Sequence, residues 1–351
     1  MKNRMYMLPL AAAAFCCCSC GAEGAAVSVV NWNVQTFFDA VNDGCEYSEF
    51  QKSGWNEQLY SARLDRLCDS IKKMDADIFV FEEIENGGVL YDIANRLAGL
   101  HRSRPWKYAC FSKNQNEAIG CAVLSRVPIR KATVHALAVS SEAAAQPAMR
   151  PVMKVILEAG GGRELALFVN HWKSKSGGAA KSEVWRNWQE SLLASLIART
   201  LSENSGAAVL ACGDFNRDIL EFKALPAAGM GGTGGADGGP SAVPNVALRL
   251  RTDFPGRNAA GAAGFYDSGE VAVHSPWFSE GGLVPPGSYY YQDEWSRIDH
   301  FFAAGGAAIA SFSPQADGGW CGADGVPWRF TMYNGRGYSD HLPIRCSVAF
   351  P

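Results

Sequence analysis

The chain has 351 residues and a formal net charge of −3. This charge argues against broad, charge-driven wrapping of nucleic acid. It does not exclude a nuclease, because a metal site needs carboxylates and a bound cation reverses the local field.

The cysteines after residue 20 are scattered and odd in number, which argues against a complete disulfide framework. Cys110, Cys121 and Cys212 lie in apolar runs, so we predict that they are core residues.

The first 20 residues have the pattern of an export signal, in which Lys2 and Arg4 precede the apolar stretch MLPLAAAAFCCC. This stretch is shorter than the ~20 apolar residues that span a bilayer. No later segment is long and apolar enough for a transmembrane helix. Cys20 is followed by Gly-Ala-Glu-Gly, which is typical of a bacterial lipoprotein cleavage site. We therefore expect export to the periplasm, cell surface or medium, with lipid attachment through Cys20 as an open alternative.

Residues 27–351 alternate strand-like apolar runs with segments of helical periodicity. The pattern predicts strands at 27–34, 77–83, 107–111, 118–125, 152–158, 164–170, 207–212, 297–303 and 344–350, and helices at 56–74, 85–100 and 183–201. Such alternation predicts an α/β protein with two packed sheets and helices outside them. The glycine-rich stretch around 229–264 cannot bury a core, so we interpret it as a surface insertion within one domain.

The most informative feature is a set of apolar runs that end in Asn, Glu, His or Asp. They are VVNWNV (Asn33), DIFVFEE (Glu83), LALFVNH (His171), AVLACGDFN (Asp214, Asn216), RIDHFF (Asp299) and YSDHLPI (Asp340, His341). Ligands and catalytic groups of α/β sheets collect where strands end. Carboxylates, carboxamides and imidazoles are the groups needed to hold a hard cation and to cut a phosphate ester.

The segments that contain Glu83 and Asp214 suggest a cation-binding site with an oriented water molecule beside it. Glu83 could hold Mg²⁺, although an acid before a helix also compensates the helix dipole, and Glu82 and Glu85 are close enough to be confused with it. In GDFN, Asp214 could orient or deprotonate a water, and Asn216 could donate a hydrogen bond to a phosphoryl oxygen. An Asx turn or a helix cap is the structural alternative for this pair.

Asp299 and His341 suggest a carboxylate–imidazole pair, in which the buried acid fixes the tautomer of the ring and stabilises its charged form. Asp340 precedes this histidine. His300 neighbours Asp299 on a strand and should therefore face the other way.

We interpret His171 as a general acid for the leaving oxygen, with Glu117 as its candidate partner. Lys173 and Lys175 follow the histidine and could contact the substrate backbone. Arg186, a further candidate substrate contact, lies three residues before Gln189 on one helix face, close enough to support the loop of His171.

Together, WNV, FEEIEN, VNHWKSK, GDFN, RIDHFF and YSDHLPI resemble the endonuclease/exonuclease/phosphatase superfamily. NHWKSKSGG and GSYYYQDEWSRIDHFFA are most similar to its bacterial extracellular nuclease branch. The resemblance implies a four-layer α/β sandwich of two packed mixed β-sheets flanked by helices, and a Mg²⁺-dependent phosphodiesterase. It implies a metal site at Asn33 and Glu83, with Asp340 supporting either the metal or the histidine. It also implies Asp214 as the activator of water, Asn216 as a phosphate contact, and His171 and His341 around the phosphate, with Asp299 orienting His341. Glu82 stands where the family usually has glutamine.

We therefore expect an exported, monomeric nuclease that prefers DNA, with RNA as an alternative substrate and Mn²⁺ or Ca²⁺ as alternatives to Mg²⁺. A second hypothesis is a relative that cuts a lipid or sugar phosphoester, such as a sphingomyelinase or an inositol-phosphate phosphatase. A third is a surface lipoprotein that keeps the fold as a binding module, but every catalytic position is filled.

Overall fold

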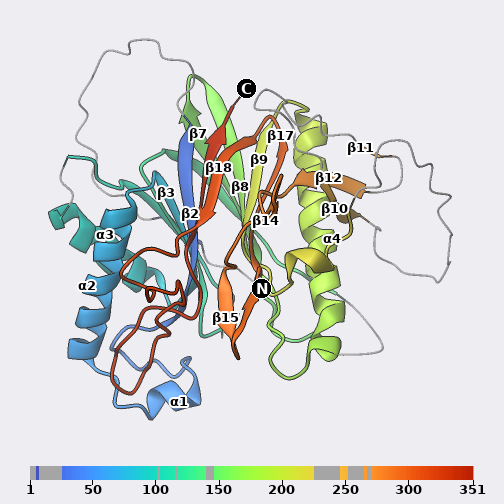
Figure 1. Ribbon diagram of the computed structural model, residues 1–351. Coiled ribbons are helices and arrows are strands. Elements are labelled where there is room, and N and C mark those ends of the chain that lie inside the picture. Colours follow the sequence, from blue (N-terminus) through green and yellow to red (C-terminus); the bar gives the residue numbers. More distant parts are fainter. Residues whose placement is uncertain are drawn as a thin grey trace.

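The computed structural model describes residues 5–7, 26–100, 103–115, 117–139, 146–224, 246–251, 265–266 and 270–350. Within them two large β-sheets pack face to face, and helices cover the outer face of each sheet (Figure 1). This arrangement confirms the predicted α/β sandwich of two mixed sheets. None of the described helices is long and apolar enough to cross a membrane.

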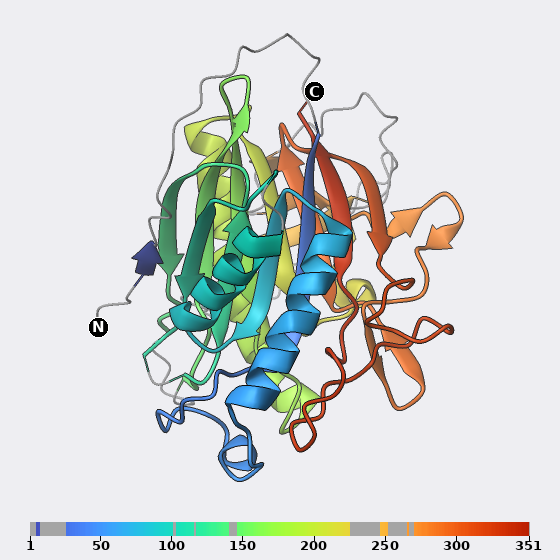
Figure 2. The same ribbon diagram turned by 90° about the vertical axis from the view of Figure 1, so that its left-hand side faces the viewer.

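The first sheet has seven strands, and its central pair runs in parallel. In spatial order the strands are β1 (Met5–Met7), β4 (Tyr108–Ser112), β5 (Gly120–Ser125), β3 (Ile78–Ile84), β2 (Val27–Phe37), β19 (Ile344–Ala349) and β18 (Ala308–Pro314). Helices α2 (Glu57–Met74) and α3 (Gly87–Leu100) lie across its outer face, which Figure 2 shows from the front. A short helix, α1 (Ser48–Gln51), precedes them.

Helix α2 shows how the sequence determines a local element. The side chain of Asn56 caps the helix by accepting hydrogen bonds from the backbone N–H groups of Gln58 and Leu59. Apolar residues spaced at helical intervals, such as Leu67 and Ile71, are buried against the sheet. The helix ends where Asp75 adopts a left-handed conformation with φ 47°. These bounds match the predicted helix at 56–74.

The second sheet has eight strands and carries helix α4 (Ala179–Glu203) on its outer face (Figure 1). In spatial order its strands are β10 (Ala247–Arg251), β12 (Glu270–His274), β17 (Asp299–Gly305), β9 (Ala208–Asp214), β8 (Arg163–His171), β7 (Val152–Gly160) and β6 (Ile129–His135), with β11 (Phe265–Tyr266) paired to β12. Beside it lie the pairs β13 (Phe278–Ser279) with β14 (Gly282–Leu283) and β15 (Tyr289–Tyr291) with β16 (Glu294–Ser296), and the 3-10 helix η1 (Ile219–Glu221).

All nine predicted strands and three predicted helices are present, with bounds shifted by a few residues. Among the strands that the sequence did not predict are β6 and β18, each of which lies at one end of a sheet. Edge strands have a solvated face, so they lack the continuous apolar run that reveals a buried strand. In β18 most residues are half-buried or exposed.

The predicted glycine-rich insertion at 229–264 lies outside the described residues except for 246–251. That part contains a strand, β10, which pairs in parallel with β12, so this portion of the stretch belongs to the sheet. The seven described cysteines are free thiols, and Cys110, Cys121 and Cys212 are buried as predicted.

Candidate active site

Three of the predicted residues are aligned by the register of the eight-stranded sheet. His171 at the end of β8 lies opposite Asp214 at the end of β9, and Asp214 lies opposite Asp299 at the start of β17. Residues directly opposite each other on neighbouring strands project from the same face of a sheet. The backbone pairing alone therefore brings two carboxylates and an imidazole to one point at the sheet end.

The seven-stranded sheet supplies Asn33 from β2 and Glu83 from β3. The Nδ2 group of Asn33 donates to Glu83 Oε1 at 3.2 Å and to Asp214 Oδ2 at 3.0 Å, so this amide joins the two sheets. Glu83 has a φ of 67° and lies at an irregularity of the β3–β5 pairing. A positive φ is uncommon for a residue with a side chain and marks local strain at functional sites.

Glu83, rather than Glu82, is the acid that contacts Asn33 and His171. Its Oε2 accepts a hydrogen bond of 2.6 Å from the backbone N–H of Thr36, and its Oε1 lies 3.9 Å from His171 Nε2. Glu82 is fully buried and accepts from Asn31 Nδ2 at 3.3 Å. Burial, followed by the charges of Asp299 and Asp214, raises the pKa of Glu82 well above 4.5. Glu82 is therefore a neutral acid where the family usually has a neutral glutamine.

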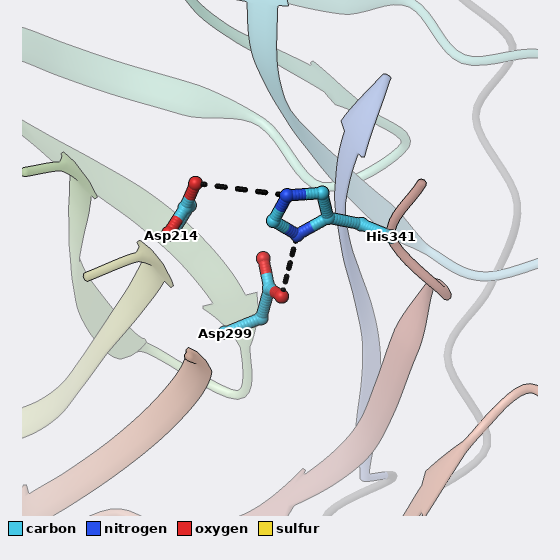
Figure 3. Close-up of side chains that lie close together, drawn as sticks. All are labelled: Asp214, Asp299 and His341. Atoms are coloured by element: carbon cyan, nitrogen blue, oxygen red, sulfur yellow. Dashed lines mark hydrogen bonds and ion pairs between the residues drawn. The ribbon is translucent and has the colours of Figure 1, made fainter. Parts of the chain in front are cut away.

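Asp299 and His341 form the predicted carboxylate–imidazole pair. Figure 3 shows the ring between two acids, with Nδ1 at 2.8 Å from Asp299 Oδ2 and Nε2 at 4.0 Å from Asp214 Oδ2. Burial alone would lower the pKa of His341, but Asp299, and then Asp214 and Asp340, raise it well above 6.5. The ring is thus an imidazolium at neutral pH.

The His341 loop is fastened to β2. Ser339 Oγ donates to the carbonyl of Asn33 at 2.6 Å and accepts from the backbone N–H of His341 at 3.0 Å. Trp32 Nε1 donates to the carbonyl of His341 at 3.0 Å. These bonds hold the loop of His341 against the strand that carries Asn33.

Asp214 lies at the centre of the site. Its Oδ2 is 3.6 Å from His171 Nε2, and its Oδ1 accepts a 2.8 Å hydrogen bond from the backbone N–H of Asn216. The Asx turn is therefore present while Asp214 also lies in the cluster, so the two interpretations of GDFN do not exclude each other. Burial raises the pKa of Asp214 to about 7, against the opposing charge of His341. A carboxylate with such a pKa can take up a proton near neutral pH.

Asn216 has a φ of 47°, and its Nδ2 donates to the carbonyl of Trp172 at 3.2 Å.

His171 is 2% exposed, and burial lowers its pKa well below 6.5. Burial therefore favours the neutral form of the ring, and the role of His171 as a general acid stays a prediction. Among the described residues, its ion-pair contacts within 4.0 Å are with Glu83 and Asp214.

Glu117 does not contact His171. Burial raises the pKa of this acid, and its Oε2 has no hydrogen-bond partner among the described residues. The charges that most affect it are those of Arg150 and Lys173. The predicted His171–Glu117 pair is therefore absent from the described part of the chain.

Asp340 lies beside the site, with Oδ1 at 4.0 Å from His341 Nε2 and Oδ2 at 3.8 Å from Arg329 Nε. Its backbone N–H donates to Gln35 Oε1 at 3.0 Å. No described contact joins Asp340 to Glu83, so Asp340 supports the imidazolium more directly than the Glu83 end of the site.

The basic residues after His171 have different surroundings. Lys175 Nζ forms an ion pair of 2.6 Å with Glu221, at the surface. The backbone of Lys173 accepts from Arg186 and donates to Gln189, which confirms that this helix face supports the loop. Arg186 is fully buried and bonded to Glu183, Ser182 and backbone carbonyls. It therefore holds the loop and is not exposed to a substrate, which corrects its predicted role.

Two positioning residues were not predicted. Gln35 accepts from the backbone N–H groups of Asp340 and Phe330, and Arg63 donates to the carbonyls of Val34, Gln35 and Thr36. Arg63 is 2% exposed. The available signal was its position on helix 56–74, four residues after Leu59 and four before Leu67, on the apolar face. His300 behaves as predicted, because it faces away and its Nε2 bonds the carbonyl of Arg217 at 2.8 Å.

The donor set suits a hard divalent cation. Ligand atoms of Asp214, Asp299 and His341 lie within 4.8 Å of one another. An imidazolium has no free lone pair, however, and the Nδ1 of His341 is engaged by Asp299. The carboxylate of Glu83, which is bonded to Asn33, is therefore the better candidate ligand, because carboxylate and amide oxygens are what Mg²⁺ and Ca²⁺ prefer.

A model of the Endonuclease/Exonuclease/phosphatase family matches residues 28–225. The chain belongs to this family. Members are generally hydrolases that act on phosphoester bonds and depend on divalent metals. No curated protein matches the chain.

Among solved structures, TDP2 from C. elegans is similar with a TM-score of 0.55 and 15% identity, over 94% of this chain and 76% of that chain. The D. rerio TDP2 humanized by 14 mutations has a TM-score of 0.50 and 15% identity, over 92% of this chain and 99% of that chain. At these identities the similarity shows a shared fold.

Proposed function

We propose that the protein is a metal-dependent phosphodiesterase, and that its substrate is nucleic acid, with DNA preferred. The proposal is supported mainly by the cluster of polar side chains at the strand ends. There Asp214 lies within 4.0 Å of both His171 and His341 and is hydrogen-bonded to Asn33. A carboxylate near its pKa, an imidazolium and a neutral imidazole are the groups that an in-line attack of water on phosphorus requires.

Each residue of the cluster has a role in this proposal. Asp214 orients the attacking water and accepts its proton. His341, held cationic by Asp299, stabilises the charge on the phosphoryl oxygens and can give a proton to the leaving oxygen. His171 and Asn216 donate hydrogen bonds to the phosphate. A divalent cation held by Glu83 and Asn33 would supply charge neutralisation, with Mg²⁺ expected and Mn²⁺ or Ca²⁺ as alternatives.

Aromatic side chains next to His341 favour a nucleic acid over a lipid. The ring of Tyr289 lies 4.7 Å from the His341 ring, and the Tyr291 ring stacks on Tyr289 at 6.2 Å with an interplanar angle of 17°. Tyr291 is 49% exposed. An exposed aromatic face beside the reacting phosphate can stack a base whatever the sequence, since every base has a π face.

The test is to incubate the purified protein with plasmid DNA, RNA, sphingomyelin and an inositol phosphate, each with Mg²⁺ or with chelator. We expect plasmid nicking that the chelator abolishes. Cleavage confined to sphingomyelin or to the inositol phosphate would replace the nuclease by the second hypothesis. No hydrolysis of any of the four would favour a binding module.

We also propose that the protein is exported as a monomer of the bacterial extracellular nuclease type. The basic residues Lys2 and Arg4 before an apolar stretch support export, and Cys20 before Gly-Ala-Glu-Gly supports a lipid anchor. Labelled palmitate should enter the native protein in a bacterial host and should not enter the Cys20→Ser variant. Equal labelling of both would refute the anchor, and gel filtration tests the monomer.

A further inference from the structure

We propose that the loop after β2 and the end of β3 form a second cation site, specific for Ca²⁺, outside the catalytic cluster. Asp43, Glu46 and Glu85 place one carboxylate oxygen each within 4.8 Å of one another. Asp39 lies beside them and donates its backbone N–H to Glu85 Oε2 at 2.5 Å, while its own carboxylate accepts from the backbone N–H of Val41 and from Asn86 Nδ2. We call Asp43, Glu46 and Glu85 the acidic loop site, and its binding of a cation does not depend on the proposed nuclease function.

A buried oxygen without a partner points to a ligand at the acidic loop site. Glu85 is 1% exposed, and its Oε1 has no hydrogen-bond partner among the described residues. Glu46 is 8% exposed. A buried carboxylate oxygen that gives up water and gains no donor is costly, and a coordinated cation removes that cost.

The acidic loop site also lacks a counter-charge. In the part of the chain that the structure describes, no Lys, Arg or His nitrogen lies within 4.0 Å of the carboxylates of Asp39, Asp43, Glu46 or Glu85. Glu190, a half-buried acid elsewhere in the described chain, is by contrast paired with Arg217. Carboxylates that lie close together without a cation repel each other when ionised, so the site favours binding of one.

The chemistry of the donors favours Ca²⁺. All of the acids are oxygen donors, and the backbone N–H groups of Asp43 and Gly44 hold the Glu46 carboxylate in place at 2.8 and 3.0 Å. A cavity of about 50 Å³, lined by Asp39, Asn42 and Glu46 among others, lies beside the loop and leaves room for water ligands. Ca²⁺ takes six to eight oxygens in flexible geometry, whereas Mg²⁺ keeps most of its water and needs fewer acids.

Binding here would stabilise the strand ends that carry the catalytic acids. The backbone N–H of Glu85 donates to the carbonyl of Phe37 at 3.1 Å, and the N–H of Thr36 donates to Glu83 Oε2 at 2.6 Å. A cation between the loop and Glu85 therefore clamps the end of β2 to the end of β3. The expected role is structural, and its readout is stability.

The test measures thermal unfolding of the Glu83→Gln protein with chelator and with Ca²⁺, because this background weakens the catalytic cation site. At a Ca²⁺ concentration of 100 times Kd, we expect the Tm to rise by about 4 °C. Tb³⁺ should also show luminescence sensitised by Trp55, which lines the cavity. Adding Asp43→Asn and Glu46→Gln should abolish both signals, whereas the matched control Glu49→Gln, an exposed acid on α1, should keep both.

An unchanged Ca²⁺ response after Asp43→Asn and Glu46→Gln would overturn the proposal, as would the absence of a response in the Glu83→Gln protein. If the double substitution prevents folding, Tb³⁺ titration of Asp43→Asn alone decides, since Asp43 is exposed: a Kd at least tenfold weaker supports the site and an unchanged Kd refutes it. Neither readout uses hydrolysis, so a failure of the proposed function is recorded separately by the substrate assay.

Discussion

The two sheets contribute different chemistry to one site. In the proposed mechanism the seven-stranded sheet supplies the cation-binding residues, Asn33 and Glu83, at a strained strand end. The eight-stranded sheet supplies the proposed proton-transfer and orienting groups, His171, Asp214 and Asp299, at regular aligned positions. If cation binding and proton transfer belong to separate sheets, substitutions in the two sheets should have distinguishable effects on activity.

The largest effect should come from the proposed proton-transfer groups of the eight-stranded sheet. Asp214→Asn keeps a hydrogen-bond acceptor at the same place but removes the group that accepts the proton of water, so kcat should fall by about 10³-fold. Added Mg²⁺ should not restore it. Steady-state hydrolysis of plasmid or of a small phosphodiester measures this, with Asp69→Asn, an exposed acid on α2, as the control for loss of charge. Turnover within tenfold of the native enzyme would refute the role of Asp214.

A smaller loss of activity, which added Mg²⁺ can reverse, is expected from a substitution at the proposed cation-binding residues of the seven-stranded sheet. Glu83→Gln should lower activity by about 10²-fold at limiting Mg²⁺, because one ionised ligand is lost. Raising the Mg²⁺ concentration should recover much of the rate, unlike in Asp214→Asn. Activity titrated against Mg²⁺ tests the contrast, and a metal-independent loss would place Glu83 among the proton-transfer groups instead.

Asp299→Asn should move the alkaline side of the pH profile. Because Asp299 raises the pKa of His341, its removal lowers that pKa, and the imidazolium loses its proton at a lower pH. Activity should therefore decline earlier as pH rises, with a loss of about tenfold at pH 7. The acidic side, where Asp214 with a pKa of about 7 becomes protonated, should stay in place or shift only slightly. An unchanged alkaline side in kcat/KM would contradict the pair.

The smallest expected effect is a change in KM that distinguishes nucleic acid from substrates without a base. Tyr291→Ala should raise KM for nucleic acid by about fivefold, since a stacked base is worth ~1 kcal/mol or more. A small phosphodiester without a base should be unaffected. Tyr91→Ala, which removes a similarly exposed tyrosine from α3, is the control. Equal effects on both substrates would show that Tyr291 supports the fold near His341 rather than a base.

Much of the fold was predictable because buried strands and amphipathic helices are local patterns. Residues 78–84 show it, since an apolar run that ends in acids predicted both a strand and a site at its end. The positioning of Glu83 was not predictable, because it depends on a left-handed φ and on an irregular pairing between β3 and β5. The sequence FEEIEN by itself specifies neither this φ angle nor this pairing.

The residues that align by register were identified correctly as neighbours, while the roles that depend on burial were not. The sequence did not specify that His171 is enclosed, and this burial lowers the pKa of its ring. Arg186 was expected at the substrate, yet helix α4 buries it under the loop that it supports. The ionisation of a side chain depends on its solvent and its neighbours in space, and a linear pattern specifies neither.

By itself the sequence determined the strands, the helices, the family and the identity of the polar residues at the strand ends, because each is encoded in short, contiguous segments. The tertiary structure decided which acid contacts Asn33 and His171, which imidazole has a raised pKa, and that Asp43, Glu46 and Glu85 meet outside the cluster. These properties arise from long-range contacts between segments as far apart as Asn33 and Asp214, and electrostatics acts through space rather than along the chain.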